Sequence, residues 1–282
     1  MTACMRWSPG RIQTWRRPED GGFDAARYGV TEIPEDAAKS YVTGRHYSGT
    51  YPAARLRYGL YDLATEPALC GVAVLSVPMS SRVLTAVFPH LQPYRESLEL
   101  GRFVLDDAVP ANGESWFLGQ AFRLAAAAGI RGLVSFSDPL PRRRADGTLV
   151  MPGHVGTIYQ ASNAAYTGRS TGRTLTLLPD GSVFSARAAQ KIRAQDRGHE
   201  YAERQLVTVG AAPRRAGQLP AEWLAVALAD VGRPVRHRGN HRYAFRLGTS
   251  RRDRAAVTVA IPAGAYPKDL DGYQGDLFRG AA

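Results

Sequence analysis

The stretch from Leu133 to Gly168 constrains the fold more than any other part of this chain. It starts with a short apolar run that is typical of a buried strand, and the run stops at Asp138 because Pro139 cannot continue a strand. Gly156 then opens a segment, 157–165, whose apolar residues recur at near-helical spacing. Sites in open α/β sheets gather beyond the carboxyl ends of strands. The stretch therefore predicts a strand, a loop and a short helix, with Asp138 as the first catalytic candidate.

The order of the other segments predicts a mixed α/β fold with a central sheet flanked by helices. Expected strands are 23–31, 55–63, 68–77, 98–105, 132–137 and 174–178, with helices at 34–42 and 113–128. Further on we expect a charged helix (185–205), an amphipathic helix (219–231), a basic hairpin or edge strand around Gly239-Asn240 and a last strand (257–261). We divide the chain into an N-terminal arm (1–22), a catalytic core (23–186) and a basic C-terminal extension packed on the core (187–282).

Positive charge is concentrated late in the chain. Residues 187–254 carry 15 Lys and Arg against 6 Asp and Glu, whereas residues 1–186 carry 19 against 16. A local basic excess favours an anionic partner such as nucleic acid, although charge runs are also common on solvated faces. The candidate phosphate contacts are Arg142, Arg143, Arg236, Arg238 and Arg242, with Tyr243 as a stacking group.

Composition excludes several classes of protein. Two cysteines, Cys4 and Cys70, are too few for a disulfide scaffold or a cysteine-based zinc site. The chain has no apolar run of the length that a membrane helix or a signal peptide needs. We therefore expect an intracellular protein with no membrane partner.

Other polar residues have both a functional and a structural interpretation. His46 suits a base, a proton relay or a metal ligand, yet a loop histidine also serves as surface. A metal site would draw on His46 and Asp138, together with His154. Arg102 interrupts a strand, and we expect a buried guanidinium paired with a structural carboxylate, such as Glu99 or Asp138, or with a substrate anion. Asp138 itself could merely cap its loop.

The start of the 113–128 helix and the 157–165 helix carry further candidates. Asn112 is expected to cap the first helix, and Glu114 in its first turn suits the helix dipole but repels a phosphate. Ser115 could cap or contact a ligand. On the second helix, Tyr159 could be catalytic or pack on the sheet, and Asn163 would share its face and could contact a base edge.

Three motifs in a fixed order carry a family resemblance. They are GRHYSGTYP (44–52), LELGRFVLDDAVPANGESWFLGQAF (98–122) and FSDP…GHVGTIYQASNAAYTG, which ends at Gly168. Together they resemble the bacteriophage Mom DNA-modification proteins, a divergent branch of the GNAT acyltransferases. The resemblance implies a GNAT-like mixed sheet and transfer of an acyl-type, carbamoylmethyl-like group to the exocyclic amine of a DNA base. It further implies adenine as the target and protection of phage DNA from restriction in the bacterial host cytoplasm.

The resemblance also assigns roles to residues. The implied catalytic residues are Asp138, His46, Tyr47, Arg102 and Tyr159, the last as the acid that protonates a leaving thiolate. The implied donor contacts are Phe103, Val104, Gly113 and Ser115, and the implied DNA contacts are Asn163, Arg142, Arg143, Arg236, Arg238 and Arg242. We expect the catalytic groups to face one cleft floored by Tyr159.

The sequence leaves more than one alternative for the acyl donor, for the oligomeric state and for the function. The Gly-rich loop by which GNAT enzymes hold coenzyme A is absent here, so the donor is acetyl-coenzyme A or another activated acyl group, with a metal ion as an option. The macromolecular partner is double-stranded or locally opened DNA, and a dimer is one option for the oligomeric state. The alternatives are an acetyltransferase acting on a small amine or a protein, and a non-catalytic DNA-binding protein.

Overall fold

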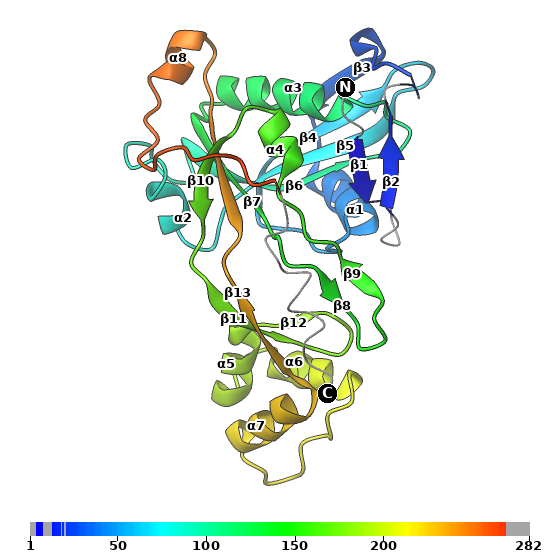
Figure 1. Cartoon of the computed structure of the whole chain (residues 1–282), viewed down its shortest axis with the longest axis vertical. Helices are drawn as coiled ribbons and strands as arrows, with labels where there is room; N and C mark the ends of the chain where they lie inside the picture. Colours follow the sequence, from blue (N-terminus) through cyan, green and yellow to red (C-terminus); the bar gives the residue numbers. More distant parts are fainter. Residues whose placement is uncertain (1–3, 8–12, 18, 20, 269–282) are drawn as a thin grey trace. The chain divides into compact units, whose positions relative to one another are not determined.

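The chain makes two excursions from one structural unit into a second one and returns after each. The computed structural model describes residues 4–7, 13–17, 19 and 21–268 (Figure 1). Of these, unit 1 holds the residues up to Ser137 together with Val155–Gly168 and His241–Lys268, and unit 2 holds Asp138–His154 and Arg169–Asn240. The boundaries therefore differ from the three consecutive parts expected from the sequence, because both excursions into unit 2 return to unit 1.

Unit 1 is built on a seven-stranded sheet with the order β10-β14-β7-β6-β5-β4-β3. The strands are β3 (Tyr28–Glu32), β4 (Ala54–Asp62), β5 (Ala68–Ser76), β6 (Ser97–Leu105), β7 (Gly132–Ser137), β10 (Ala165–Arg169) and β14 (His241–Arg246). β6 and β7 run parallel, while the β3–β4, β4–β5, β5–β6 and β7–β14 pairs are antiparallel. A parallel pair needs a crossover, and the helix between β6 and β7 supplies it.

Helices cover both faces of this sheet (Figure 1). They are α1 (Glu35–Arg45), α2 (Arg82–Thr85), α3 (Gly113–Ala127) and α4 (Thr157–Ala161), while α8 (Arg251–Ala255) buries none of its residues. Leu75 of β5 shares a core with Phe117 of α3, whereas Val74 shares another with Val42 of α1. Adjacent strand residues point to opposite faces, so the apolar run of β5 is buried on both sides. The mixed α/β class expected from the sequence is confirmed.

Unit 2 combines a small sheet, a hairpin and three helices. The sheet has the order β12-β11-β13, and the hairpin pairs β8 with β9. The bounds are β8 (Arg142–Arg143), β9 (Leu149–Met151), β11 (Arg173–Leu177), β12 (Val183–Phe184), β13 (Arg233–His237), α5 (Ala186–Ala194), α6 (His199–Thr208) and α7 (Pro220–Val231). Ile192, Leu206 and Trp223, one from each helix, meet in a common apolar core.

Several expected elements differ from the structure. The expected 185–205 helix is divided between α5 and α6, because Gln195 and Gly198 take positive φ angles of 51° and 88°. Of the two alternatives for the basic segment, the hairpin does not form, since β13 pairs with β11 and β14 pairs with β7, whereas β13 is an edge strand of its three-stranded sheet. The expected 257–261 strand is not a strand. Among the described residues, every helix is too short or too polar to span a bilayer.

The expected N-terminal arm contains a strand pair, β1 (Cys4–Trp7) with β2 (Gln13–Arg16). Arg6 of β1 is buried and ion-paired with Glu114 of α3. The described part of residues 1–22 is therefore attached to unit 1 by a buried guanidinium, which an apolar periodicity cannot reveal. Other positions of the expected arm lie outside the described residues.

Candidate functional site

The strands β6 and β7 pair over only three positions and then part. Their register runs from Ser97–Gly132 to Glu99–Val134, although β6 continues to Leu105 and β7 to Ser137. Beyond Glu99 the facing backbone edges of these two fully described strands are therefore not paired with each other. Ser135 of β7 uses its hydroxyl to donate to the Leu100 carbonyl across this opening, at 3.3 Å. Open strand edges can accept an extended ligand, so this opening is where a substrate or donor could enter the sheet.

Arg102 lies on β6 just past the point where the strands part. Its Nε donates to the Thr50 carbonyl at 3.0 Å, its Nη2 to the Thr50 hydroxyl at 2.6 Å and its Nη1 to the Gly101 carbonyl at 2.6 Å. The side chain is half-buried, and burial lowers the pKa of Arg102, while Tyr47, Glu99 and Tyr159 raise it. In place of the expected ion pair with a carboxylate, the guanidinium donates to Thr50 in the loop after α1 and to the β6 backbone at Gly101.

His46 and Tyr47 begin the loop that follows α1. Their rings lie 4.2 Å apart, and the His46 Nδ1 is 2.8 Å from the Ser48 hydroxyl. The Ser48 backbone N–H also donates to this Nδ1, at 3.2 Å, so the proton of a neutral imidazole sits on Nε2. Because Tyr47 acts on the pKa of Arg102, this loop borders the same part of unit 1.

Tyr159 of α4 is buried, with 8% of its surface exposed. Its ring packs against Tyr243 at 5.4 Å and Phe245 at 6.2 Å between centroids. Burial raises the pKa of Tyr159 and the Glu99 charge raises it further, whereas Ser135 and Arg102 lower it. The phenol therefore stays protonated at neutral pH and can donate a proton. Unit 1 thus brings together Tyr47, Arg102 and Tyr159.

Asp138 is the first residue of unit 2, and its carboxylate is fully engaged. It accepts from the Leu140 N–H at 2.9 Å, from Arg142 Nη2 at 3.0 Å and from His237 Nε2 at 2.9 Å. The Gly239 N–H donates to the other ring nitrogen of His237, so His237 carries its proton on Nε2. Burial raises the pKa of Asp138, but the hydrogen bonds and the Arg142 charge lower it overall.

This environment bears on the expected role of Asp138. A carboxylate with a lowered pKa stays ionised near neutral pH and takes up a proton poorly, so the geometry favours an anchoring role over a general base. His237 was missed from the sequence, because its position beside Asp138 comes from the pairing of β13 with β11. The expected single cleft joins residues of both units and stays a prediction.

The part of the chain that the structure describes offers no set of ligands for the expected metal site. Among the described residues, no group of three or more His, Cys, Asp or Glu side chains is close enough to hold a metal ion. His154 donates its backbone N–H to the Asp138 carbonyl at 2.8 Å. Burial lowers the pKa of His154, and the Asp138 charge opposes that effect. The protein therefore has a neutral imidazole beside a carboxylate, which falls short of a ligand set.

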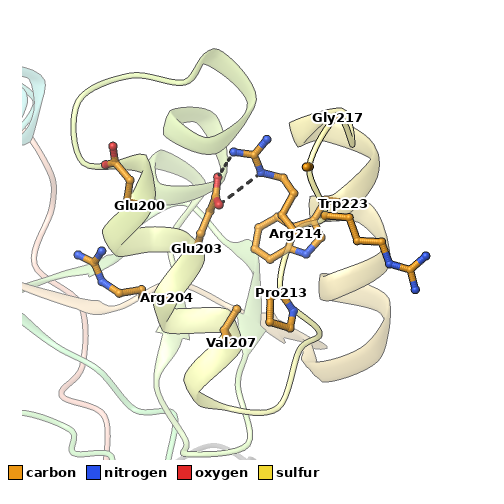
Figure 2. A pocket seen from close by; sticks show the side chains of 10 residues that line it. Glu200, Glu203, Arg204, Val207, Pro213, Arg214, Gly217 and Trp223 are labelled. Carbon is orange, nitrogen blue, oxygen red and sulfur yellow. Dashed lines mark hydrogen bonds and ion pairs between the residues drawn. The ribbon is translucent and has the colours of Figure 1, made fainter.

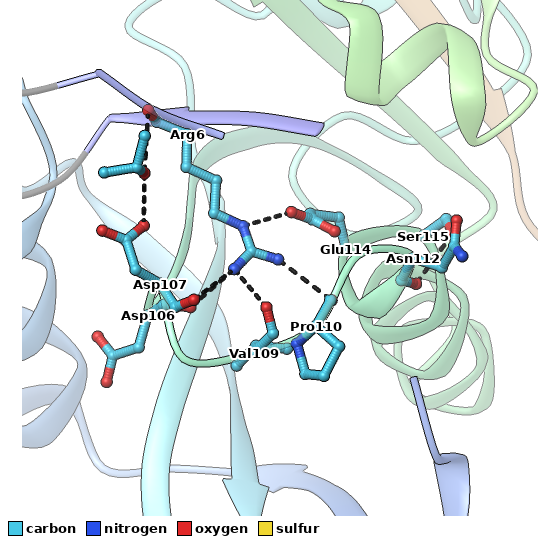
Figure 3. Close-up of polar contacts among 9 residues, drawn as sticks. Arg6, Asp106, Asp107, Val109, Pro110, Asn112, Glu114 and Ser115 are labelled. Atoms are coloured by element: carbon cyan, nitrogen blue, oxygen red, sulfur yellow. Dashed lines mark hydrogen bonds and ion pairs between the residues drawn. The ribbon is translucent and has the colours of Figure 1, made fainter. Parts of the chain in front are cut away.

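The N-terminus of α3 is organised around Arg6 (Figure 3). Arg6 Nε lies 2.6 Å from Glu114 Oε1, and Nη1 donates to the carbonyls of Asp106 at 3.0 Å and Val109 at 2.5 Å. The expected Asn112 cap has φ 77° and makes no side-chain cap hydrogen bond. The buried Glu114 occupies the first turn, where a diphosphate would otherwise bind the helix amides.

The other expected donor contacts are used for packing. Phe103 stacks on Phe117 with centroids 5.5 Å apart, and Val104 packs into the core beneath α1. Gly113 is buried, and a Cβ there would lie 2.5 Å from Val109. The Ser115 hydroxyl donates to the Asn112 carbonyl at 3.2 Å. Only the backbone of Phe103 and Val104 is thus suited to contact a donor.

The expected DNA contacts differ in how far they are exposed, and exposed Arg143 also donates to the Gly147 carbonyl at 2.9 Å. Arg142 is bonded to Asp138, and Arg242 of β14 donates to the Thr167 carbonyl at 2.8 Å. Arg143, Arg236 and Arg238 are exposed. Two expectations are wrong. Asn163 lies beyond the end of α4 with φ 60° and is not on the face of Tyr159, and Tyr243 is fully buried and cannot stack on a base.

A separate cavity of about 460 Å³ lies in the helical part of unit 2 (Figure 2). Its lining includes Trp223, Val207 and the ion pair between Arg214 and Glu203 at 3.3 Å. The Trp223 Nε1 donates to the Ala212 carbonyl at 2.8 Å. None of the site residues expected from the sequence lines this cavity.

Comparison with known proteins gives one family and several distant structures. The model of the Mom protein family matches residues 27–268. A proposed phosphinothricin N-acetyltransferase is 12% identical, with 78% of this chain and 99% of that chain covered and a TM-score of 0.36. Spermidine N-acetyltransferase from Vibrio cholerae, in complex with CoA and spermine, is 8% identical over 56% of this chain and 88% of its own, with a TM-score of 0.32. A tandem GNAT protein from the clavulanic acid biosynthesis pathway is 12% identical over 84% and 75%, with a TM-score of 0.34. No curated protein matches the chain.

Proposed function

Because the chain belongs to the Mom protein family, we propose that it is a transferase that moves an acyl-type group onto the exocyclic amine of a DNA base, with adenine as the target. The observation that carries the proposal is the grouping of Tyr47, Arg102 and Tyr159 where β6 and β7 part. Such an enzyme would act on phage DNA in the host cytoplasm and protect that DNA from restriction.

The grouping has the parts that acyl transfer needs. The amine nitrogen bonds to the carbonyl carbon of an activated acyl donor, and the bond from that carbon to its leaving group breaks. The Arg102 guanidinium stabilises the negative charge that develops on the carbonyl oxygen. The protonated Tyr159 phenol gives its proton to the leaving group. The donor lies along the open edge of β6, against the backbone of Phe103 and Val104.

The N-terminus of α3 restricts the donor. A diphosphate there would meet the buried Glu114 carboxylate, and the neighbouring Arg6 guanidinium is already bonded to that carboxylate and to loop carbonyls. The proposal therefore includes a donor whose phosphates, if it has any, are not held by this helix.

The charge of unit 2 supports DNA as the second substrate. Its described residues, 138–154 and 169–240, carry 15 Lys and Arg against 8 Asp and Glu. Exposed Arg143, Arg236 and Arg238 are suited to phosphate contacts, which are independent of base sequence. An amine inside a duplex is not accessible, so the target base must be flipped out or already unpaired.

Expression of the full chain in a bacterial host carrying a plasmid tests this function. Nucleosides from the plasmid are analysed by mass spectrometry, and a mass-shifted deoxyadenosine is expected. Tyr159→Phe should lower the modified fraction, by about 10²-fold or more if proton donation limits the rate. The matched control is Tyr201→Phe, at an exposed tyrosine of α6. Unmodified nucleosides in cells that contain folded protein would refute DNA modification, and the adduct mass identifies the transferred group.

A further inference from the structure

Glu99 occupies the last position at which β6 and β7 are paired. It lies opposite Val134 of β7 on one side and Ser76 of β5 on the other. Immediately beyond it the two parallel strands part. A carboxylate therefore sits on the sheet at the edge of the opening, although from the sequence Glu99 was considered only as a structural partner for Arg102.

A β-bulge places Glu99 and Arg102 on the same face of the sheet. In the β5–β6 register, Ser76 pairs with Glu99, Leu75 with Leu100 and Val74 with Arg102, so Gly101 is the extra residue. In a regular strand, residues three apart point to opposite faces, but the extra residue restores a common face. Residue 101 must be glycine here, since a Cβ would lie 2.2 Å from the Ser76 hydroxyl oxygen.

The surroundings of Glu99 differ from those of Asp138. Burial raises the pKa of the Glu99 carboxyl, and the Arg102 charge only partly offsets this effect. Glu99 in turn raises the pKa of Tyr159, and Arg102 also interacts with Tyr47. Among the described residues, the groups whose charge acts together with that of Glu99 are thus the Arg102 guanidinium and the Tyr159 phenol. Asp138, by contrast, is held ionised by Arg142, His237 and a backbone N–H.

From this placement we propose that Glu99 is the proton acceptor of the transfer reaction, beside Arg102 and Tyr159 in the opening between β6 and β7. As the C–N bond forms, the exocyclic amine loses one proton to the Glu99 carboxylate. As the bond to the leaving group breaks, the leaving group takes the proton of Tyr159. Glu99 then releases this proton to water and Tyr159 takes one up from water, so the site ends in its starting protonation state. This step depends on the proposed function.

The test compares Glu99→Gln with Glu96→Gln, which removes a carboxylate just before β6 whose oxygen accepts from the Gln92 N–H. Plasmid DNA is incubated at several pH values in lysate of cells that express the full chain. The lysate supplies the donor. Glu99→Gln should lower the rate of nucleoside modification about 10²- to 10⁴-fold and abolish the fall in rate on the acid side. Glu96→Gln should keep both the rate and the acid limb. Glu99→Asp, which retains a carboxylate, should keep the acid limb at a reduced rate.

A second readout needs no donor. Because burial disfavours the ionised carboxylate, Glu99→Gln should melt at a higher temperature than the wild-type chain, by a difference that grows as pH rises through the pKa of Glu99. A merely structural Glu99 would give a Gln variant that melts lower at every pH. If the wild-type chain modifies DNA and Glu99→Gln retains its rate, Glu99 is not the acceptor. If the wild-type chain modifies no DNA while the melting difference follows pH as expected, the proposed function fails and the unusual titration of Glu99 stands.

Discussion

Replacing Asp138 by alanine should destabilise unit 2 strongly. The substitution removes the acceptor of three hydrogen bonds, from Leu140, Arg142 and His237. The His237 side chain is 1% exposed, so its Nε2–H donates to Asp138 away from solvent. Leaving one such donor unpaired costs about 1–3 kcal/mol. Breaking a buried pair that includes a charged partner costs about 3–5 kcal/mol. We therefore expect a loss of about 3–5 kcal/mol.

The assay should report on unit 2 separately, because a chain of two units need not unfold in one step. Hydrogen exchange at the Gly239 amide, which donates to His237 Nδ1, follows this contact directly. Asp138→Asn should lose less than Asp138→Ala, since the amide oxygen can still accept one hydrogen bond. A double-mutant cycle with His237→Ala should give a coupling energy of about 1–3 kcal/mol.

The contribution of Asp138 to the stability of the folded chain should change with pH in one direction. The pKa of Asp138 is lower in the folded chain than in the unfolded chain. Its contribution is therefore fully present above the unfolded value, near 3.9, and is lost as pH falls through the folded value. Two results would contradict this account. One is an Asp138→Ala variant whose free energy of unfolding at neutral pH lies within about 1 kcal/mol of the wild-type value. The other is an Asp138→Ala variant that loses as much stability in acid as the wild-type chain. If Asp138→Ala were fully stable yet inactive, Asp138 would again be the favoured base.

Three other perturbations have expected outcomes. Arg6→Met should cost about 3–5 kcal/mol by chemical denaturation, because it removes the guanidinium from a buried ion pair with Glu114, whereas exposed Arg17→Met should cost little. Arg236→Gln with Arg238→Gln should lower the slope of log Kd against log salt for duplex DNA by about 1.8, and an unchanged slope would exclude them as phosphate contacts. Gly156→Ala should lower DNA modification and stability together, because φ is 73° and a Cβ would lie 2.8 Å from the Tyr159 and Tyr243 rings; full activity would contradict this.

Much of the sheet in unit 1 could be predicted because residue type and local spacing are enough to indicate its strands and helices. The expected 132–137 strand coincides with β7, and 113–128 differs from α3 by one residue. The expected strands 55–63 and 68–77 correspond to β4 and β5, which pair with each other. The basic hairpin failed because alternation and a Gly-Asn turn specify a reversal of the chain, but cannot specify which strands are paired.

Among the site residues, the sequence found those that interrupt an apolar pattern. Arg102, Asp138 and Tyr159 stand out because a charge or a phenol in an apolar segment needs a reason. Glu99 and His237 were not singled out, since their environments come from the Gly101 bulge and from β11, which lies far from both in sequence. A bulge inserts one residue and changes which side chains share a face, and no local pattern reports it.

By itself, the sequence determined the mixed α/β class, the basic excess and the position of Asp138 at a strand end, because each follows from residue type and local spacing. Only the tertiary structure decided which carboxylate stays ionised and which is suited to accept a proton. Both are acids on or after core strands, yet Asp138 accepts three hydrogen bonds, whereas Glu99 is half-buried and has the Arg102 charge near it. The pKa of a carboxyl group depends on its solvation and on the charges near it in space, and long-range pairing of strands sets both.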